Sequence, residues 1–357
     1  MNKDFHYEGT YAAAILARFS PEDAAIIAWA AQTVDECTSE NLDKYYSVYK
    51  SWEPVYTSET VLEDIQEEFS SVLSDETSST LQSVRNIWMP FHFLPGNLDN
   101  HTKYEGKEAL RTERDIRDFL CLCEPASPLV SDMINTSIRT FTNLSITERR
   151  LYLVKLGILM HVLADTWAHQ HFTGSPNYLI NEVNNLSVTN PVPVPNDFSA
   201  RVSPPGPTNY SLSYLGHGRA GHYPDYGCMH FQYTPKWRES SHNNVIHKSN
   251  TDDFENAFLE MYYALYCHQY ARTYSTASAL ALNEDWRICI RDIVSTVSSS
   301  QSHQWRQQLA DFVDYKDLPE YTFADHSKQM NLFQSYAREH QSYVMGYVQR
   351  NGNILNT

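Results

Sequence analysis

The sequence has few cysteines and a deficit of basic residues. Its six cysteines are scattered over 357 residues, without the density of a disulfide framework or the paired spacing of a zinc ribbon, so free and mostly buried thiols are expected. Lysine and arginine total 27 against 43 acidic residues, a formal net charge of −16. This charge disfavours non-specific attraction to nucleic acid or to an anionic membrane, and therefore a nucleic-acid scaffold role.

Membrane-spanning and secretory signals are also lacking. No run of the sequence approaches the roughly 20 apolar residues that cross a bilayer. The start, MNKDFHYEGTY, has neither the charged and apolar regions nor the cleavage site of a secretory signal. We therefore expect no transmembrane segment and an intracellular, cytoplasmic location. The apolar content of 42% is sufficient for a substantial core.

Amphipathic helical patterns dominate what is present. Strand-like alternation is sparse, whereas apolar residues recur at intervals of three and four, so the sequence predicts an all-α fold with one multi-helix domain over residues 1–357. Ser20-Pro21 is typical of a helix N-terminus and starts a helix over the following apolar residues. The other predicted helices cover 9–19, 59–74, 105–121, 127–143, 146–171, 252–282 and 327–349.

Between residues 174 and about 250 the composition changes. Segments such as NPVPVPNDF and SPPGPTNY are rich in proline, asparagine and glycine, which helices do not tolerate. A connection of this length in a compact domain is usually functional or disordered, and its aromatic residues and histidines favour an ordered loop. The sequence therefore predicts a long irregular insertion in the helical domain.

Residues 161–172, HVLADTWAHQHF, place metal-binding side chains in an apolar helical run. On a helix, His161, Asp165 and His169 advance by about 40° per step and share one stripe. A single buried histidine is more often a hydrogen-bonded core residue, but the cluster favours a metal site for zinc or another first-row ion. His171 reaches the same cavity if the helix ends or distorts before Gly174, so His169 and His171 compete for one ligand position.

Four further candidates are weak when each is taken alone. Asp4 and His6 lie at the N-terminus, Asp35 ends an apolar helix, and His92 lies between two phenylalanines. A carboxylate in the last turn of a helix is more often a capping or salt-bridged residue, and a histidine between aromatic rings is more often packed.

The segment GHGRAGHYPDYG, residues 216–227, concentrates polar groups of the same kind. It contains His217, His222 and Asp225, with glycines that permit tight turns. Arg219 is a candidate partner for an oxyanion or a phosphate. The alternative is a polar surface loop, and the segment alone does not decide between the two.

In chain order these residues resemble the ligands of the zinc-dependent phospholipase C and single-strand-specific zinc nuclease superfamily. The resemblance covers roughly residues 4–226 and is specific mainly in HVLADTWAHQH, with its His-x-x-x-Asp pair and a histidine at the sixth place after Asp165. It implies an all-helical fold with two or three zinc ions. This sequence departs from the pattern in its start, where the family uses a processed N-terminal residue and Asp4 is the candidate substitute. It also departs in the shorter spacing from His222 to Asp225, which makes His217 a rival ligand.

The resemblance also implies how the ligands are shared among the ions. Asp165 would bridge. One ion would have His92 and His161 with Asp35 and Asp165; a second would have His171, His222 and Asp225; a third would have His6, with Asp4 and Asp165.

Two such ions can activate water and stabilise a leaving oxygen, so we expect a hydrolase of phosphoric esters. Asp35 is the candidate general base, and the expected substrate is a small phosphate ester, a nucleotide or a lipid headgroup. Because histidine and aspartate also bind iron and manganese, a redox metalloenzyme is one alternative. A non-enzymatic protein stabilised by its metals is another.

Overall fold

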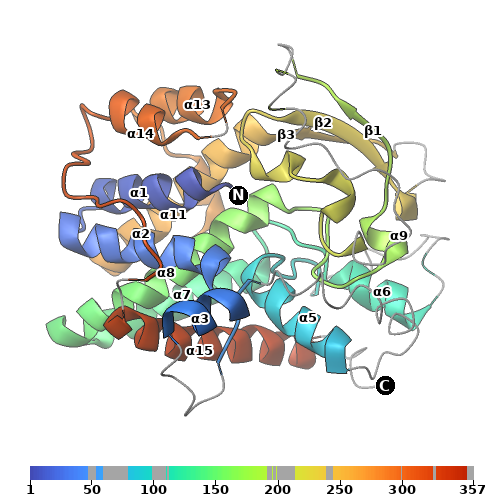
Figure 1. The fold of residues 1–357 in the computed structure, drawn as a ribbon, viewed down its shortest axis with the longest axis horizontal. Helices are drawn as coiled ribbons and strands as arrows, with labels where there is room; N and C mark the ends of the chain where they lie inside the picture. Colours follow the sequence, from blue (N-terminus) through green and yellow to red (C-terminus); the bar gives the residue numbers. More distant parts are fainter. Residues whose placement is uncertain are drawn as a thin grey trace.

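The computed structural model describes residues 1–46, 54–58, 79–98, 110, 112–190, 195, 198, 214–238, 244–298, 300–324 and 327–351. Within them the chain is mostly helical, with one small sheet (Figure 1). The helices are η1 (Phe5–Gly9), α1 (Thr10–Leu16), α2 (Pro21–Glu36), α3 (Ser39–Tyr46), α5 (Ser79–Phe91), α6 (Glu113–Leu120), α7 (Pro128–Asn143), α8 (Ile146–Ala168), α9 (Tyr178–Asn181), η3 (Gly218–Ala220), η4 (Tyr223–Asp225), η5 (Lys236–Arg238), α11 (Asn250–Tyr270), α12 (Thr276–Leu280), α13 (Arg287–Ser295), α14 (Ser302–Gln308) and α15 (Ser327–Asn351). The strands are β1 (Val183–Val188), β2 (His230–Pro235) and β3 (Ile246–Ser249).

Helix α8 is the centre of the fold. It begins with a capping box, in which the Ser145 hydroxyl accepts from the Glu148 backbone N–H and the Glu148 carboxylate accepts from the Ser145 N–H. By length and composition alone α8 could cross a bilayer, with a mean hydropathy of 1.3 in its most apolar window. However, 89% of that window is buried inside the protein. A helix that is apolar on all sides and surrounded by other helices is a core helix.

Helices α2, α11 and α15 pack around α8 (Figure 1). The closest approach is at Gly157, where an added Cβ would lie 2.3 Å from the Ile27 carbonyl oxygen and 2.5 Å from the Ala30 Cβ. A larger side chain would force α2 away from α8, because a packed core has no space to absorb it. This contact places Asp35, in the last turn of α2, beside the C-terminal half of α8.

The insertion between 174 and 250 is more regular than predicted. It contributes the three strands, which form an antiparallel sheet in the order β1-β2-β3, and the short helices α9, η3, η4 and η5. The sheet pairs Val183 with Pro235 and His230 with Ser249. The prediction of an all-α fold is therefore correct only as a largely helical one.

The predicted helices at 127–143, 146–171 and 327–349 correspond to α7, α8 and α15 with small shifts at their ends. The helix predicted over 252–282 is two helices, because α11 ends at Tyr270 and Ala271 adopts a left-handed conformation. Of the helix predicted over 105–121, the structure describes α6. The helix predicted over 59–74 lies outside the described residues.

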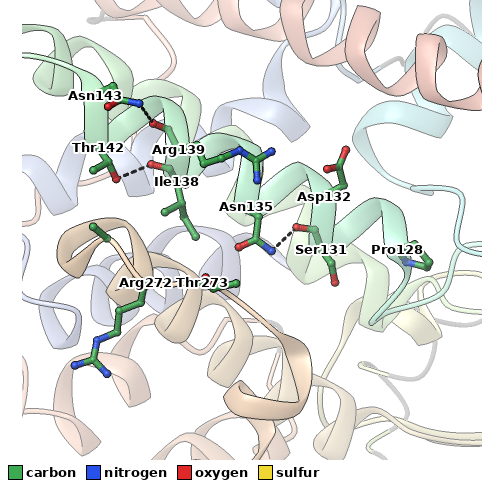
Figure 2. Close-up of a pocket in the computed structure, with 11 residues that line it drawn as sticks. Pro128, Ser131, Asp132, Asn135, Ile138, Arg139, Thr142, Asn143, Arg272 and Thr273 are labelled. Atoms are coloured by element: carbon green, nitrogen blue, oxygen red, sulfur yellow. Dashed lines mark hydrogen bonds between the residues drawn. The ribbon is translucent and has the colours of Figure 1, made fainter.

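A pocket of about 770 Å³ lies between α7 and the residues that follow α11 (Figure 2). Its lining includes Asn135 and Arg139 of α7 and Arg272, just after the end of α11. Asn135 Nδ2 donates to the Ser131 carbonyl oxygen at 2.8 Å within α7. None of the metal ligands predicted from the sequence lines this pocket, so it is separate from the candidate metal centre.

Candidate metal centre

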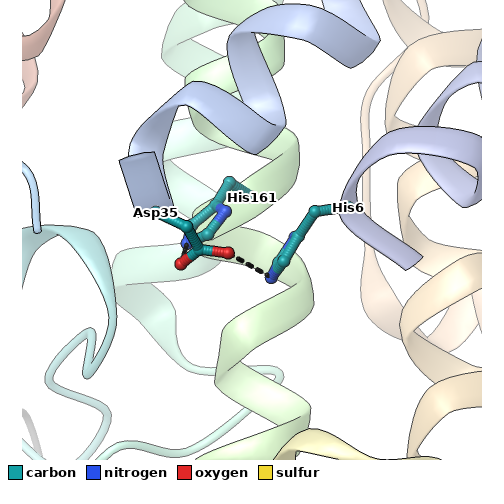
Figure 3. Close-up of side chains that lie close together, drawn as sticks. All are labelled: His6, Asp35 and His161. Carbon is teal, nitrogen blue, oxygen red and sulfur yellow. Dashed lines mark ion pairs between the residues drawn. The ribbon is translucent and has the colours of Figure 1, made fainter. Parts of the chain in front are cut away.

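The first residues of the chain and three distant segments converge on the C-terminal half of α8. His6 lies in the short π-helix η1, Asp35 in α2, and His92 immediately after α5. Figure 3 shows the side chains of His6, Asp35 and His161 meeting from three separate helices, with ion pairs from Asp35 to both histidines. Figure 1 places the N-terminus in the middle of the molecule, between the helices and the sheet.

The structure forms three adjoining groups of side chains that could hold a metal ion. The inner group is His92, His161 and Asp165; the outer group is His169, His217 and Asp225; the N-terminal group is His6, Asp35 and His161. Within each group the candidate ligand atoms all lie within 4.8 Å of one another.

Asp165 connects the three groups. Its side chain is 1% exposed, and its two oxygens contact five nitrogen atoms. These are the Met1 amine at 2.6 Å and His6 Nε2 at 3.2 Å from Oδ1, with His161 Nε2 at 3.1 Å, His92 Nδ1 at 3.2 Å and His169 Nδ1 at 3.6 Å from Oδ2. One buried carboxylate surrounded by so many nitrogen atoms is suited to bridging cations.

In the inner group, the hydrogen bonds of His92 determine which nitrogen is free. Its Nε2 lies 2.8 Å from the Thr57 carbonyl oxygen, which only accepts, so Nε2 carries the proton. In a neutral imidazole the lone pair is then on Nδ1, which faces Asp165 Oδ2 at 3.2 Å and His161 Nε2 at 3.4 Å. His92 Nδ1 and Asp165 Oδ2 are then two acceptors that face each other, an arrangement that a proton or a cation between them makes favourable.

The outer group repeats this arrangement twice. His169 donates from Nδ1 to the His92 carbonyl oxygen at 2.8 Å, and its Nε2 faces Asp225 Oδ1 at 3.2 Å. His217 donates from Nδ1 to the Gly221 carbonyl oxygen at 2.8 Å, and its Nε2 faces the same oxygen of Asp225 at 3.4 Å. An outer N–H held by a backbone carbonyl is the usual support of a metal-bound histidine, because it fixes both tautomer and ring orientation.

The N-terminal group is partly open to solvent. His6 and His161 are fully buried and stack with ring centroids 3.9 Å apart. The Asp35 side chain is 31% exposed, and its oxygens lie 3.7 Å from His161 Nε2 and 4.0 Å from His6 Nε2. Within the described part of the chain, Nδ1 of both histidines is buried without a hydrogen-bond partner.

The spacing of the inner group fits a small tetrahedral ion. Zinc with bonds of about 2.0–2.1 Å sets neighbouring ligand atoms about 3.3 Å apart. His92 Nδ1, His161 Nε2 and Asp165 Oδ2 are separated by 3.4, 3.2 and 3.1 Å. The residues present therefore match zinc in both ligand type and distance.

The protonation of the site also suits cation binding. Burial, with the neighbouring His161 and the Met1 amine, lowers the pKa of His6 to about 4. Burial opposes the charge of Asp165, but His169, the amine and His161 outweigh it and hold the pKa of its carboxyl well below the usual range. Neutral imidazoles and ionised carboxylates are the forms that bind metals. For His92, burial is outweighed by Asp165, which raises the pKa of the imidazole, as expected where a proton takes the place of a cation.

Three predicted ligands lie outside the groups that the described residues form. Asp4 accepts a hydrogen bond from the Gln301 backbone N–H instead. His171 follows the end of α8 and has a φ of 76°, and its N–H donates to the Cys123 carbonyl oxygen. The His222 side chain is 66% exposed and contacts Asp225 from outside, Nδ1 to Oδ2 at 3.1 Å. Asp4, His171 and His222 therefore lie outside these three groups in this structure, and the ligand roles that the resemblance implies for them stay predictions.

Arg219, predicted as an oxyanion partner, is engaged elsewhere. Its Nε lies 3.1 Å from Glu182 Oε1, and its guanidinium lies over the Tyr214 ring. The carboxylate of Glu182 offsets part of its charge, and the role of Arg219 toward an oxyanion stays a prediction.

Two features of the site were not predicted from the sequence. The amine of Met1 is buried beside Asp165, 2.6 Å from its Oδ1. Phe93 stacks on His169 with ring centroids 4.8 Å apart. Its position next to His92 in the sequence could have indicated that it lies at the site.

These observations define a largely helical protein with adjoining histidine and aspartate groups around one buried carboxylate. The chain belongs to DUF6765, a family of unknown function whose sequence profile matches residues 1–348. No curated protein and no solved structure matches the chain.

Proposed function

We propose that the protein is a metal-dependent hydrolase of phosphoric esters that uses two or three divalent ions, with zinc as the expected metal. The observation that carries the proposal is the orientation of His92, His169 and His217. Each donates its outer N–H to a backbone carbonyl and directs the other nitrogen at a carboxylate, Asp165 for His92 and Asp225 for the other two. In the absence of cations this arrangement places lone pairs against negative charge, whereas cations make it favourable.

The exposure of the site favours catalysis over a purely structural role. His6, His161 and Asp165 are at most 1% exposed, whereas Asp35, Asp225 and His217 have 31%, 17% and 14% of their side chains exposed. Structural metal sites are closed by protein ligands, and catalytic sites keep a position open to water or substrate. The exposed edge formed by Asp35 and the outer group supplies that opening.

Each part of the site has a distinct role in the proposed reaction. Bound ions would polarise the phosphoryl group and lower the pKa of water. Asp35 lies beyond hydrogen-bond distance of His92 and His161 and is accessible, so its carboxylate is free to accept a proton from the attacking water. Asp165 keeps the histidines oriented from inside.

We propose that the substrate binds in a cleft of about 650 Å³ whose lining residues lie close to candidate ligands along the chain. Its lining includes Lys3, Tyr7 and Tyr226, which neighbour His6 or Asp225 along the chain. Aromatic walls and mixed charges suit the organic portion of a phosphate ester. The expected substrates are small phosphate esters, nucleotides and lipid headgroups.

The test is hydrolysis of a panel of phosphomonoesters and phosphodiesters by protein stripped with a chelator and then supplied with Zn²⁺, Mn²⁺ or Fe²⁺. We expect activity to return with a divalent ion. Replacing Asp35 with asparagine should lower the rate by about 10²–10⁴-fold, the usual contribution of a general base. The matched control is Asp43→Asn, at an exposed position of α3. Metal-loaded protein that hydrolyses none of the esters would refute the hydrolase.

A further inference from the structure

The junction of β3 and α11 contacts the two chain segments that carry His169 and Asp225 of the outer group. Lys248 lies in β3, and Asn250 is the first residue of α11. Both are buried, with 4% and 0% of their surfaces exposed. Neither was singled out by its position in the sequence, and neither belongs to the groups formed by the candidate ligands.

Asn250 holds the segment that carries Asp225. Its Nδ2 donates to the carbonyl oxygens of Tyr223 at 2.6 Å and Tyr226 at 2.9 Å. Because both oxygens only accept, the atom between them is the amide nitrogen rather than the amide oxygen. These two carbonyls bracket Asp225 in the chain. The next residue adds a third support, since Thr251 Oγ1 donates to the Gly227 carbonyl oxygen at 2.8 Å.

Lys248 holds the end of α8, two residues before His169. Its Nζ donates to the Trp167 carbonyl oxygen at 3.1 Å and pairs with Asp253 at 2.5 Å. Gln170 Nε2 donates to the same carbonyl and to Asp253. A cation at this point satisfies one of the carbonyls that a helix leaves without a partner at its C-terminus.

We propose that Asn250 and Lys248 are positioning residues of the outer metal site, a role that rests on the proposed function. Asn250 sets the direction of Asp225, and Lys248 sets the point where α8 ends and His169 turns toward Asp225. Both residues lie at the junction of β3 and α11, so the same short stretch of chain positions His169 and Asp225. The inner group depends instead on Thr57 and on the body of α8.

The proposal predicts a selective loss. Residues that support metal ligands without touching the metal typically contribute about 10- to 100-fold to metal affinity. Removing the donors of Asn250 or the ammonium of Lys248 should therefore lower the affinity of the outer group for its ion by about this factor. The affinity of the inner group for its ion should not change. A residue with only a general structural role would change both affinities or neither.

The first test is Asn250→Asp, which keeps the shape of the side chain but replaces the donating amide with an acceptor. Chelator competition and Co²⁺ absorption spectra measure the affinity and coordination of each ion. The matched control is Asn135→Asp in the separate pocket of Figure 2, because Asn135 also holds a chain segment through its amide, with bonds to the N–H and carbonyl of Tyr274. We expect Asn250→Asp alone to weaken one ion and change its Co²⁺ spectrum.

The second test, Lys248→Met, affects the segment of His169 rather than that of Asp225. It remains informative even if Asn250→Asp does not fold. Its control is Lys155→Met, which removes another partly buried, ion-paired lysine, this one in α8. Circular dichroism in chelator separates loss of fold from loss of metal. Lys248→Met should weaken the same ion as Asn250→Asp.

The outcomes separate this inference from the proposed function. Wild-type protein that binds fewer than two ions overturns both. Wild-type protein that binds two ions, with both variants binding them as tightly, overturns the positioning role and leaves the proposed function standing. Equal weakening in the Asn135 or Lys155 controls also overturns the positioning role, because the loss would then follow from any buried polar change.

Discussion

Replacing Asp165 with asparagine tests two proposed roles of this carboxylate, which are pairing with the Met1 amine and bridging metal ions. Asparagine has nearly the same shape, so the change removes charge and one acceptor without creating a cavity. In chelated protein, the Met1 amine loses its partner at 2.6 Å in a fully buried place. Leaving one member of a buried ion pair alone typically costs about 3–5 kcal/mol, and Asp225, at 3.8 Å from the amine, offsets only part of this.

With metal present the variant should lose more. An ion supplied at about 1,000 times its dissociation constant stabilises the folded state by about 4 kcal/mol. Because Asp165 contacts His6, His92, His161 and His169, its loss affects more than one ion, and most of this metal-dependent gain should disappear.

The assay is urea unfolding of wild type and Asp165→Asn, each with Zn²⁺ and with chelator, alongside elemental analysis. The exposed control, Asp43→Asn, should match wild type in all conditions. An Asp165→Asn protein that keeps both the metal content and the full gain in unfolding free energy on adding Zn²⁺ would refute the bridging role.

Three further predictions concern single groups. His169→Gln should remove one ion while His171→Gln retains all of them, measured by elemental analysis; the reverse result would restore the sixth-place histidine as the ligand. Extending the chain ahead of Met1 replaces its amine with a peptide N–H and should lower the metal content and the thermal midpoint, and no change in either would show that the amine has no part in the site. Burial lowers the pKa of His268 from 6.5 to about 4, so the unfolded state binds the extra proton and the unfolding free energy should fall by about 3 kcal/mol as the pH decreases through this window. His268→Gln should remove that part of the pH dependence of urea unfolding, and an unchanged slope would contradict it.

Much of the helical frame follows from local signals in the sequence. Ser20 caps α2 as predicted, because its hydroxyl accepts from the Asp23 N–H. The spacing of His161 and Asp165 on α8 needs only the helical repeat. The sheet was missed because β1, with the sequence VNNLSV, contains two asparagines and shows no clear alternation of apolar and polar residues.

The sequence left open the choice between His169 and His171 and between His217 and His222 as ligands, because each choice depends on where the chain turns. Helix α8 ends at Ala168, so His169 remains beside Asp165, and the positive φ of His171 directs the chain away. In the 216–227 loop, the bond from His217 to the Gly221 carbonyl oxygen turns that histidine toward Asp225. The backbone at His171 is held by a partner far away in the chain, the Cys123 carbonyl oxygen, which a local pattern does not contain.

The central claim is that cations join these histidines and aspartates, and metal content tests it most directly. Protein purified without chelator and without added metal should contain more than one equivalent of divalent ion per chain by elemental analysis. Chelation should then lower its thermal midpoint. A fully folded preparation that contains no metal, and binds none when Zn²⁺ is added, would contradict the account.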